Sequence, residues 1–257
     1  MITDPFFYAV AIPAVLFVGL SKGGFGGAMA LFGVPLMALA VSPVQAAAIM
    51  LPILIVMDAV SLWTWRHERD LTTLKMMLPG AMLGIGIGWA TAAYVTEALI
   101  RLIVGLVALW FALGYFLGRL RARRGIQQPA RGHDPVRGTL WGTISGFTSF
   151  VSHAGGPPFQ IYALPLRHNP KTYTGTSVRF FAVVNAVKLI PYFALGQFDA
   201  ANLKTSLALT PLAPAATLAG AFVVRRLKPQ VFYPLMYAMI LVTAVKLIAD
   251  GTLHYLP

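Results

Sequence analysis

Long apolar segments separated by short polar joints are the feature that most constrains this chain. Six of these segments are about 20 residues long, which is the length an α-helix needs to cross the hydrocarbon core of a bilayer. They lie at residues 44–65, 74–95, 98–117, 172–195, 203–224 and 231–249. Of the 257 residues, 58% are hydrophobic and only 11% are charged, whereas about 25% are charged in a typical soluble domain. We therefore expect an all-α polytopic membrane protein.

The charge distribution and the absence of cysteine exclude several function classes. The net charge is +12, but the basic residues lie in short joints beside apolar segments. That placement favours orientation in a membrane and contact with anionic headgroups over binding of nucleic acid. Without cysteine, the chain has no thiol catalysis, no Fe–S cluster and no Cys-ligated zinc. We expect no metal and no cofactor.

A polar stretch with six arginines, residues 119–137, divides the chain. We interpret residues 1–118 as an N-terminal repeat, 119–137 as a basic cytoplasmic linker and 138–257 as a C-terminal repeat. Short matches recur in the same order at an offset of 127 to 131 residues. They include Ser21 with Ser152, Asp58 with Asn185, and Leu74 with Leu203. Collinear matches of this kind indicate a duplication, which is common in transporters.

Each repeat begins with an apolar segment that glycines interrupt. Residues 5–41 contain the first glycine cluster (residues 21–27), and residues 138–166 contain the second glycine cluster (residues 152–158). Glycines next to a cation do not continue a helix through hydrocarbon. Each segment is therefore either one broken helix that crosses the membrane or a re-entrant hairpin that returns to its starting side.

The basic residues favour the hairpin. With two hairpins, each repeat crosses three times, and one face receives fourteen of the sixteen basic residues in the joints. With two crossing segments the same residues divide ten to six. Because cytoplasmic loops are enriched in Lys and Arg, we expect the first arrangement. The fold is then two homologous inverted halves, each a glycine-broken re-entrant hairpin plus three transmembrane helices, with both termini periplasmic.

The two glycine clusters carry the predicted anion site. Lys22 and His153 occupy equivalent positions, each after a serine and before glycines. Glycine lets backbone N–H groups approach a ligand, and the start of a short helix carries partial positive charge. The residues predicted to bind substrate are Ser21, Lys22, Gly23, Gly24, Phe25, Ser152, His153, Gly155, Gly156 and Arg179. The alternative is a glycine-rich packing contact, with Lys22 extending to an interface.

The remaining ionisable residues inside predicted spans each have two interpretations. Arg179 either binds an oxyanion or pairs with Asp58. Asp58, the only acid well inside a predicted span, forms an ion pair or exchanges a coupling proton, and its repeat mate is Asn185. Lys188 follows Arg179 by nine residues, so we expect it on the opposite side of the helix, lining a cavity or extending to an interface.

Small residues form a face on one span of each repeat. Gly80, Gly84 and Gly88 are spaced by four in the first, and Ala216 and Gly220 in the second. Such faces let helices approach closely. We expect packing within one chain, and a homodimer seam is the alternative.

The glycine clusters, each followed by a proline and a proline-initiated span in duplicated halves, resemble the TauE/SafE sulfite exporter family over nearly the whole chain. The resemblance implies a secondary transporter of sulfite, sulfoacetate or a related organosulfonate in the bacterial inner membrane. It implies alternating access driven by a proton or ion gradient. Ala154 stands where the family often has a glycine, so the substrate is predicted only as a small anion. A channel and a carrier of a non-sulfur organic anion are the alternatives.

An enzyme is not expected. Ser152 and His153 are adjacent, so on a helix their side chains diverge by about 100°. No separate set of nucleophile, base and orienting group is evident in the sequence.

Overall fold

The chain forms two compact units, each built from two separate segments. The computed structural model describes residues 2–25, 32–91, 94, 96–122, 130–194 and 199–253, and every regular element within these ranges is a helix. Unit 1 comprises Met1–Asp70 and Pro170–Leu227, and unit 2 comprises Leu71–Asn169 and Lys228–Pro257. Each unit combines segments of both predicted repeats. The two units are described separately below.

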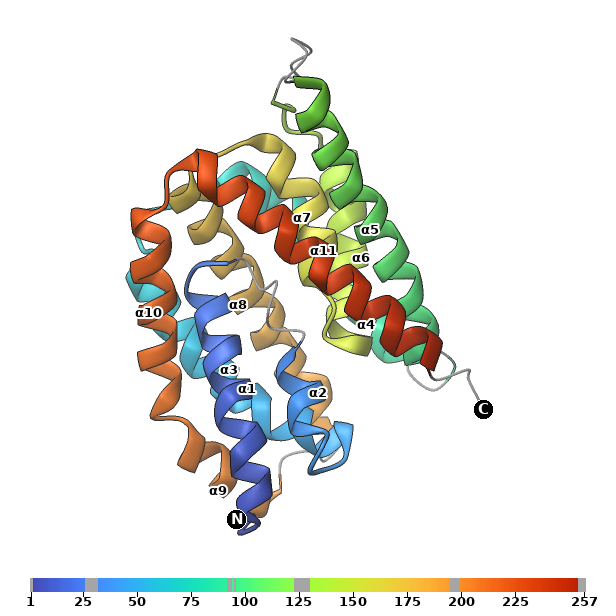
Figure 1. The fold of residues 1–257 in the computed structure, drawn as a ribbon. Helices are drawn as coiled ribbons and strands as arrows, with labels where there is room; N and C mark the ends of the chain where they lie inside the picture. Colours follow the sequence, from blue (N-terminus) through green and yellow to red (C-terminus); the bar gives the residue numbers. More distant parts are fainter. Residues whose placement is uncertain are drawn as a thin grey trace. The chain divides into compact units, whose positions relative to one another are not determined.

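Unit 1 contains six of the helices in Figure 1: α1 (Pro5–Gly24), α2 (Gly33–Met37), α3 (Pro43–Thr64), α8 (Pro170–Ala194), α9 (Ala200–Leu209) and α10 (Leu212–Arg226). Polar side chains fix where three of them begin. Asp4, Ser42 and Asp199 each accept a hydrogen bond from a backbone N–H in the first turn of α1, α3 and α9. A proline also opens α1 and α3, where its missing N–H has no cost.

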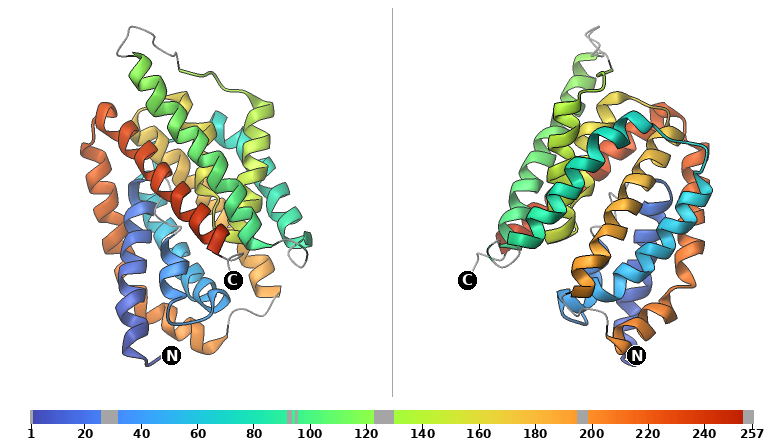
Figure 2. Two further views of the ribbon diagram at one scale, coloured as in Figure 1. Left: turned by 45° about the vertical axis from the view of Figure 1, so that its right-hand side comes forward. Right: turned by 180° about the vertical axis from the view of Figure 1, so that it is seen from behind.

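The helices α1, α3 and α9–α10 run parallel in unit 1. At one end the backbone N–H of Ile2 donates to Thr205, and the Gln45 side chain donates to Asn202. At the other end the Trp65 indole donates to the carbonyl of Gly23. The start of α3 therefore lies at the end of unit 1 at which α1 began, so the chain returns there between these two helices (Figure 2). A hairpin would return the chain in this way. However, α1 alone has 20 residues and is about 30 Å long, which is the thickness of the hydrocarbon core of a bilayer.

Unit 2 contains α4 (Leu71–Thr91), α5 (Glu97–Ala122), α6 (Pro135–Ser152), α7 (Gly156–Ala163), the 3₁₀ helix η2 (Leu164–Leu166) and α11 (Pro229–Leu253). The helices α4 and α6 pack in parallel, and α5 crosses α11 in antiparallel fashion. The second broken segment also reverses direction. The Tyr162 hydroxyl, near the end of α7, donates to the carbonyl of Asp134, the residue that caps the start of α6.

The small-residue faces pack within the chain, as predicted. A Cβ on Gly84 would lie 2.0 Å from the carbonyl oxygen of Thr143 on α6. In unit 1, a Cβ on Gly23 would lie 2.0 Å from the carbonyl oxygen of Thr217 on α10, and one on Gly220 would lie 2.2 Å from that of Leu20. These backbones touch directly, so the glycines are required for the close approach of α4 to α6 and of α1 to α10.

Among the described residues, five helices are long and apolar enough to cross a membrane: α1, α3, α4, α5 and α11. The pair α9 and α10 is bent by 46° and makes a sixth if it is one span. Except for α1, these helices coincide with predicted spans. The remaining predicted span, residues 172–195, coincides with the more polar α8. The helix α1 was predicted as one arm of a hairpin, but it is itself long and apolar enough to cross a membrane.

Candidate functional site

A buried ion pair joins α1 to α3 in unit 1. Lys22 Nζ lies 2.6 Å from Asp58 Oδ1, and the Asn185 amide donates to Asp58 Oδ2 at 2.6 Å. All three residues are more than nine-tenths buried. The predicted repeat mates Asp58 and Asn185 therefore touch, and Asp58 is paired with Lys22. Asp58 lies six residues before the end of α3, or about 9 Å along the axis.

Lys188 belongs to the same buried group, which excludes one of its two expected roles, extension to an interface. Its side chain is only 1% exposed, so it does not extend to an interface, and it interacts electrostatically with Lys22 and Asp58. It follows Asn185 by three residues on α8 and therefore shares that residue's helix face. We call Lys22, Asp58, Asn185 and Lys188 the buried charge cluster.

The face of α8 that carries the cluster was present in the sequence but was not used. Phe181, Asn185 and Lys188 are spaced by four and three residues, as on one face of a helix. The ring centroid of Phe181 lies 5.6 Å from Lys22 Nζ, so this face also supplies an aromatic contact to the ammonium group. The prediction instead derived the helix face of Lys188 from its spacing to Arg179, whose side chain has a different role.

Arg179 binds the segment that follows α3 rather than Asp58. Its guanidinium donates to four backbone carbonyls, those of Trp65, Arg66, Glu68 and Gly175. The first three lie just after the end of α3 at Thr64, and the fourth lies one turn earlier on α8. The alternative pair with Asp58 is thus replaced by contacts to the backbone after α3, and contact of Arg179 with an anion stays a prediction.

The first glycine cluster forms the C-terminal turn of α1. Ser21 to Gly24 are helical and Phe25 follows, whereas Gly26, Gly27 and the expected start of the second arm near Ala28 lie outside the described residues. Side chains satisfy the carbonyls of this turn. Those of Lys22, Gly23 and Gly24 accept hydrogen bonds from Ser61, Trp65 and Thr174. In the described part of this cluster, the group that can attract an anion is the Lys22 ammonium.

The second glycine cluster, in unit 2, links α6 to the short helix α7. Ser152 ends α6, and α7 begins at Gly156. His153 is half-buried and adopts a left-handed conformation with φ 55°. A Cβ on Gly155 would lie 2.7 Å from that of Ser149. The chain therefore reverses tightly before α7, and the N-terminus of this short helix lies within the cluster itself. Lys22 and His153 belong to different units, and their convergence stays a prediction.

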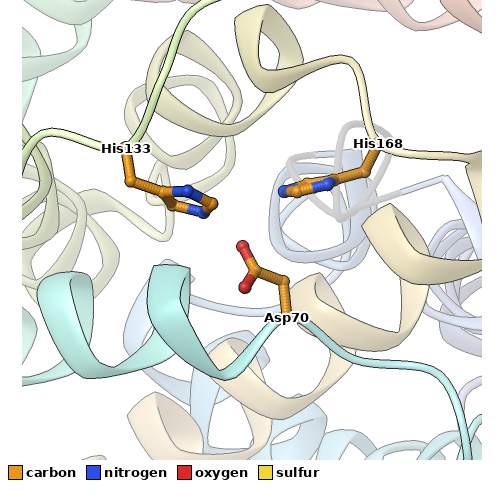
Figure 3. A group of neighbouring side chains, drawn as sticks. All are labelled: Asp70, His133 and His168. Carbon is orange, nitrogen blue, oxygen red and sulfur yellow. The ribbon is translucent and has the colours of Figure 1, made fainter.

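Two histidines form a separate contact in unit 2. The ring centroids of His133 and His168 lie 5.8 Å apart (Figure 3). Asp70, the third residue labelled there, is the last residue of unit 1, where its backbone N–H donates to Thr176. Because these side chains belong to two units, we assign them no common site.

Comparison with known proteins identifies the family. The chain matches the family model described as sulfite exporter TauE/SafE over residues 11–247, which include both glycine clusters and the buried charge cluster. No curated protein and no solved structure matches the chain.

Proposed function

The chain belongs to the TauE/SafE sulfite exporter family of multi-pass membrane transporters, which are not enzymes, and we propose that it carries a small sulfur-containing anion. Sulfite, sulfoacetate and related organosulfonates are the candidate substrates, and the bacterial inner membrane is the proposed location. The observation that carries the proposal is that two lysines, Lys22 and Lys188, are buried with a single carboxylate in the buried charge cluster.

The cluster holds two ammonium groups and one carboxylate, all buried. A charge removed from water is costly unless an opposite charge balances it. With Lys22, Lys188 and Asp58 ionised, one positive charge remains in excess. The two lysines lie on different helices, α1 and α8, so an oxyanion held by both would neutralise the excess and bridge the helices.

The net charge of the cluster with an anion bound suggests how a proton is coupled to transport. A monoanion makes the cluster neutral, whereas a dianion leaves one negative charge that a proton on Asp58 removes. The groups facing Asp58 are Lys22 from α1 and Asn185 and Lys188 from α8. Elsewhere on its neighbours, Arg225 of α10 donates to the carbonyl of Thr64 near the end of α3, and Lys204 of α9 is exposed. Asp58 is therefore the group we propose as proton acceptor.

Alternating access requires two related halves that rearrange against each other. Reciprocal packing supports this proposal: the first helix of one predicted repeat packs on the penultimate span of the other, as α1 on α10 and as α6 on α4. Both broken segments also reverse direction. His153 supports a role for the second cluster, because a non-glycine residue in the left-handed region costs about 1 kcal/mol. We therefore propose that the His153 imidazole contributes to the anion site.

The test is stabilisation of the purified protein by sulfite, sulfoacetate, sulfate, taurine and acetate, since a ligand that binds the native state raises its unfolding temperature. We expect Lys22→Gln and Lys188→Gln each to weaken anion affinity about tenfold or more, because charge-assisted hydrogen bonds contribute roughly 1.5–3 kcal/mol. Lys246→Gln is the matched control, because Lys246 pairs with Asp250 within α11 at 2.5 Å.

Three outcomes would contradict the proposal. Unchanged affinity in both cluster variants would remove these lysines from the site. Stabilisation by acetate but by none of the sulfur oxyanions would favour the non-sulfur alternative. A flux into liposomes that does not saturate with anion concentration would indicate a channel.

A further inference from the structure

Unit 2 contains a pocket of about 710 Å³ that the proposed transport site does not use. It lies between α5, η2 and the first turns of α11, and none of its lining residues belongs to the buried charge cluster. We propose that this pocket binds an anionic membrane phospholipid, with the phosphate held by arginines and an acyl chain lying along α5. This inference stands independently of the substrate proposed above.

Three arginines supply the charge. Arg119 comes from the end of α5, Arg131 from the segment before α6, and Arg167 from the residue after η2. All three side chains are exposed, and no acidic residue lines the pocket. Guanidinium groups bind phosphate oxygens in pairs of parallel hydrogen bonds. An uncompensated charge of +3 around one pocket therefore favours a phosphate-bearing ligand.

Backbone contacts fix two of the arginines before any ligand arrives. The N–H of Arg131 donates to the carbonyl of Pro165 at 2.9 Å, and that of Arg167 donates to the carbonyl of Leu164 at 3.1 Å. Two aromatic lining residues also hold each other in place, because Tyr115 and Tyr237 stack with ring centroids 3.6 Å apart. The arginines are thus presented on a preformed frame, which reduces the entropy lost on binding.

The aromatic part of the pocket favours a lipid over a free anion. Trp110 and Arg119 both line it and lie nine residues apart on α5, or about 14 Å along the axis. The Trp110 side chain is 83% exposed on a helix that is apolar enough to cross a membrane. A pocket that is basic at one end and aromatic along a membrane-facing helix fits a headgroup and the start of an acyl chain.

The predicted topology agrees with this ligand. The pocket brings together Arg119 at the start of the basic linker, Arg131 within it, the joint after η2 and the start of α11. The positive-inside rule assigns all of these segments to the cytoplasmic face, where basic pockets between membrane helices bind anionic headgroups.

The experiment measures phosphatidylglycerol bound to the full-length protein in neutral detergent by native mass spectrometry. The pocket variant is Arg119→Gln/Arg131→Gln/Arg167→Gln. The control variant is Lys75→Gln/Arg137→Gln/Lys171→Gln, which removes the same charge from exposed residues that do not line the pocket. We expect the pocket variant to lose about tenfold or more in affinity for the first lipid, because each basic residue near anionic lipid contributes roughly 1 kcal/mol. The control variant should bind like the wild type.

Further arms distinguish the possible ligands. Phosphatidylcholine should bind the wild type more weakly than phosphatidylglycerol, and Trp110→Ala should weaken binding of the long-chain lipid only. Inorganic phosphate and glycerol phosphate should not displace the lipid at similar concentrations. Equal losses in the two triple variants would overturn the proposal, since attraction would then depend on net charge alone. Displacement by inorganic phosphate would assign the pocket to a free anion and would also overturn it.

Discussion

Asp58 balances the charges of unit 1, because it contacts Lys22 directly and interacts electrostatically with Lys188. Replacing it with asparagine leaves two buried ammonium groups without a carboxylate. Removing one partner of a buried ion pair typically costs about 3–5 kcal/mol. We therefore expect Asp58→Asn to lower the unfolding temperature of the purified protein markedly, as measured by the intrinsic fluorescence of its tryptophans during heating.

A double variant tests whether the loss of stability comes from the unbalanced charge. Asp58→Asn/Lys188→Met returns the cluster to a single positive charge while keeping the bulk of the side chain. The double variant should therefore regain part of the lost stability. If it were no more stable than Asp58→Asn, Lys188 would not belong to the electrostatic network.

At the scale of elements, two glycines on α4 offer a matched comparison. A Cβ on Gly84 would meet the Thr143 carbonyl of α6 at 2.0 Å, whereas a Cβ on Gly86 would meet nothing within 4 Å. Gly84→Ala must separate the two helices and should destabilise the protein by about 1–3 kcal/mol, the usual cost of overpacking. Gly86→Ala should be neutral or slightly stabilising, because alanine favours the helix. Similar unfolding temperatures for the two variants would contradict direct packing of α4 on α6.

The apolar lengths in the sequence predicted the helices well, because spanning a bilayer sets a minimum run of hydrophobic residues. They did not predict side-chain partners. Arg179 and Lys188 differ in role because α8 passes the end of α3, which places Arg179 beside the backbone carbonyls that follow α3 and Lys188 beside Asp58. Nor did they reveal the bend between α9 and α10, since both parts are apolar and continuous in sequence. Crossing geometry decides the partners of Arg179 and Lys188, and hydropathy does not encode it. The bend lies at Pro211, a local signal that a count of apolar residues does not record.

For the whole molecule, the order of helices along the chain and their grouping in space differ. The sequence divides at the basic linker, but each compact unit takes helices from both predicted repeats. The reciprocal pairs, α1 with α10 and α4 with α6, explain this difference. In each pair, a helix of one predicted repeat packs against a helix of the other. The predicted repeats therefore follow the order of the sequence, whereas each compact unit contains helices that pack together.

Membrane orientation provides the prediction for the whole chain. In unit 1, Lys204 lies on α9, the helix that contacts Ile2 and Gln45, whereas Arg226 ends α10 beside Arg225, which binds the end of α3. These two residues are therefore at opposite ends of parallel helices. The positive-inside rule places the Arg226 end in the cytoplasm. The natural chain contains no cysteine, so single substitutions can be labelled without background.

A membrane-impermeant maleimide added to intact cells should accordingly label Lys204→Cys but not Arg226→Cys. Both side chains are exposed, so after permeabilisation both should react, which controls for burial. Arg137→Cys, at the end of the linker, should behave like Arg226→Cys if the second broken segment is a re-entrant hairpin, because two crossings then separate the two residues. Labelling of Arg226→Cys in intact cells would reverse the assigned orientation. Opposite behaviour of Arg226→Cys and Arg137→Cys would contradict the hairpin arrangement, because an odd number of crossings would then separate residues that the two hairpins place on one face.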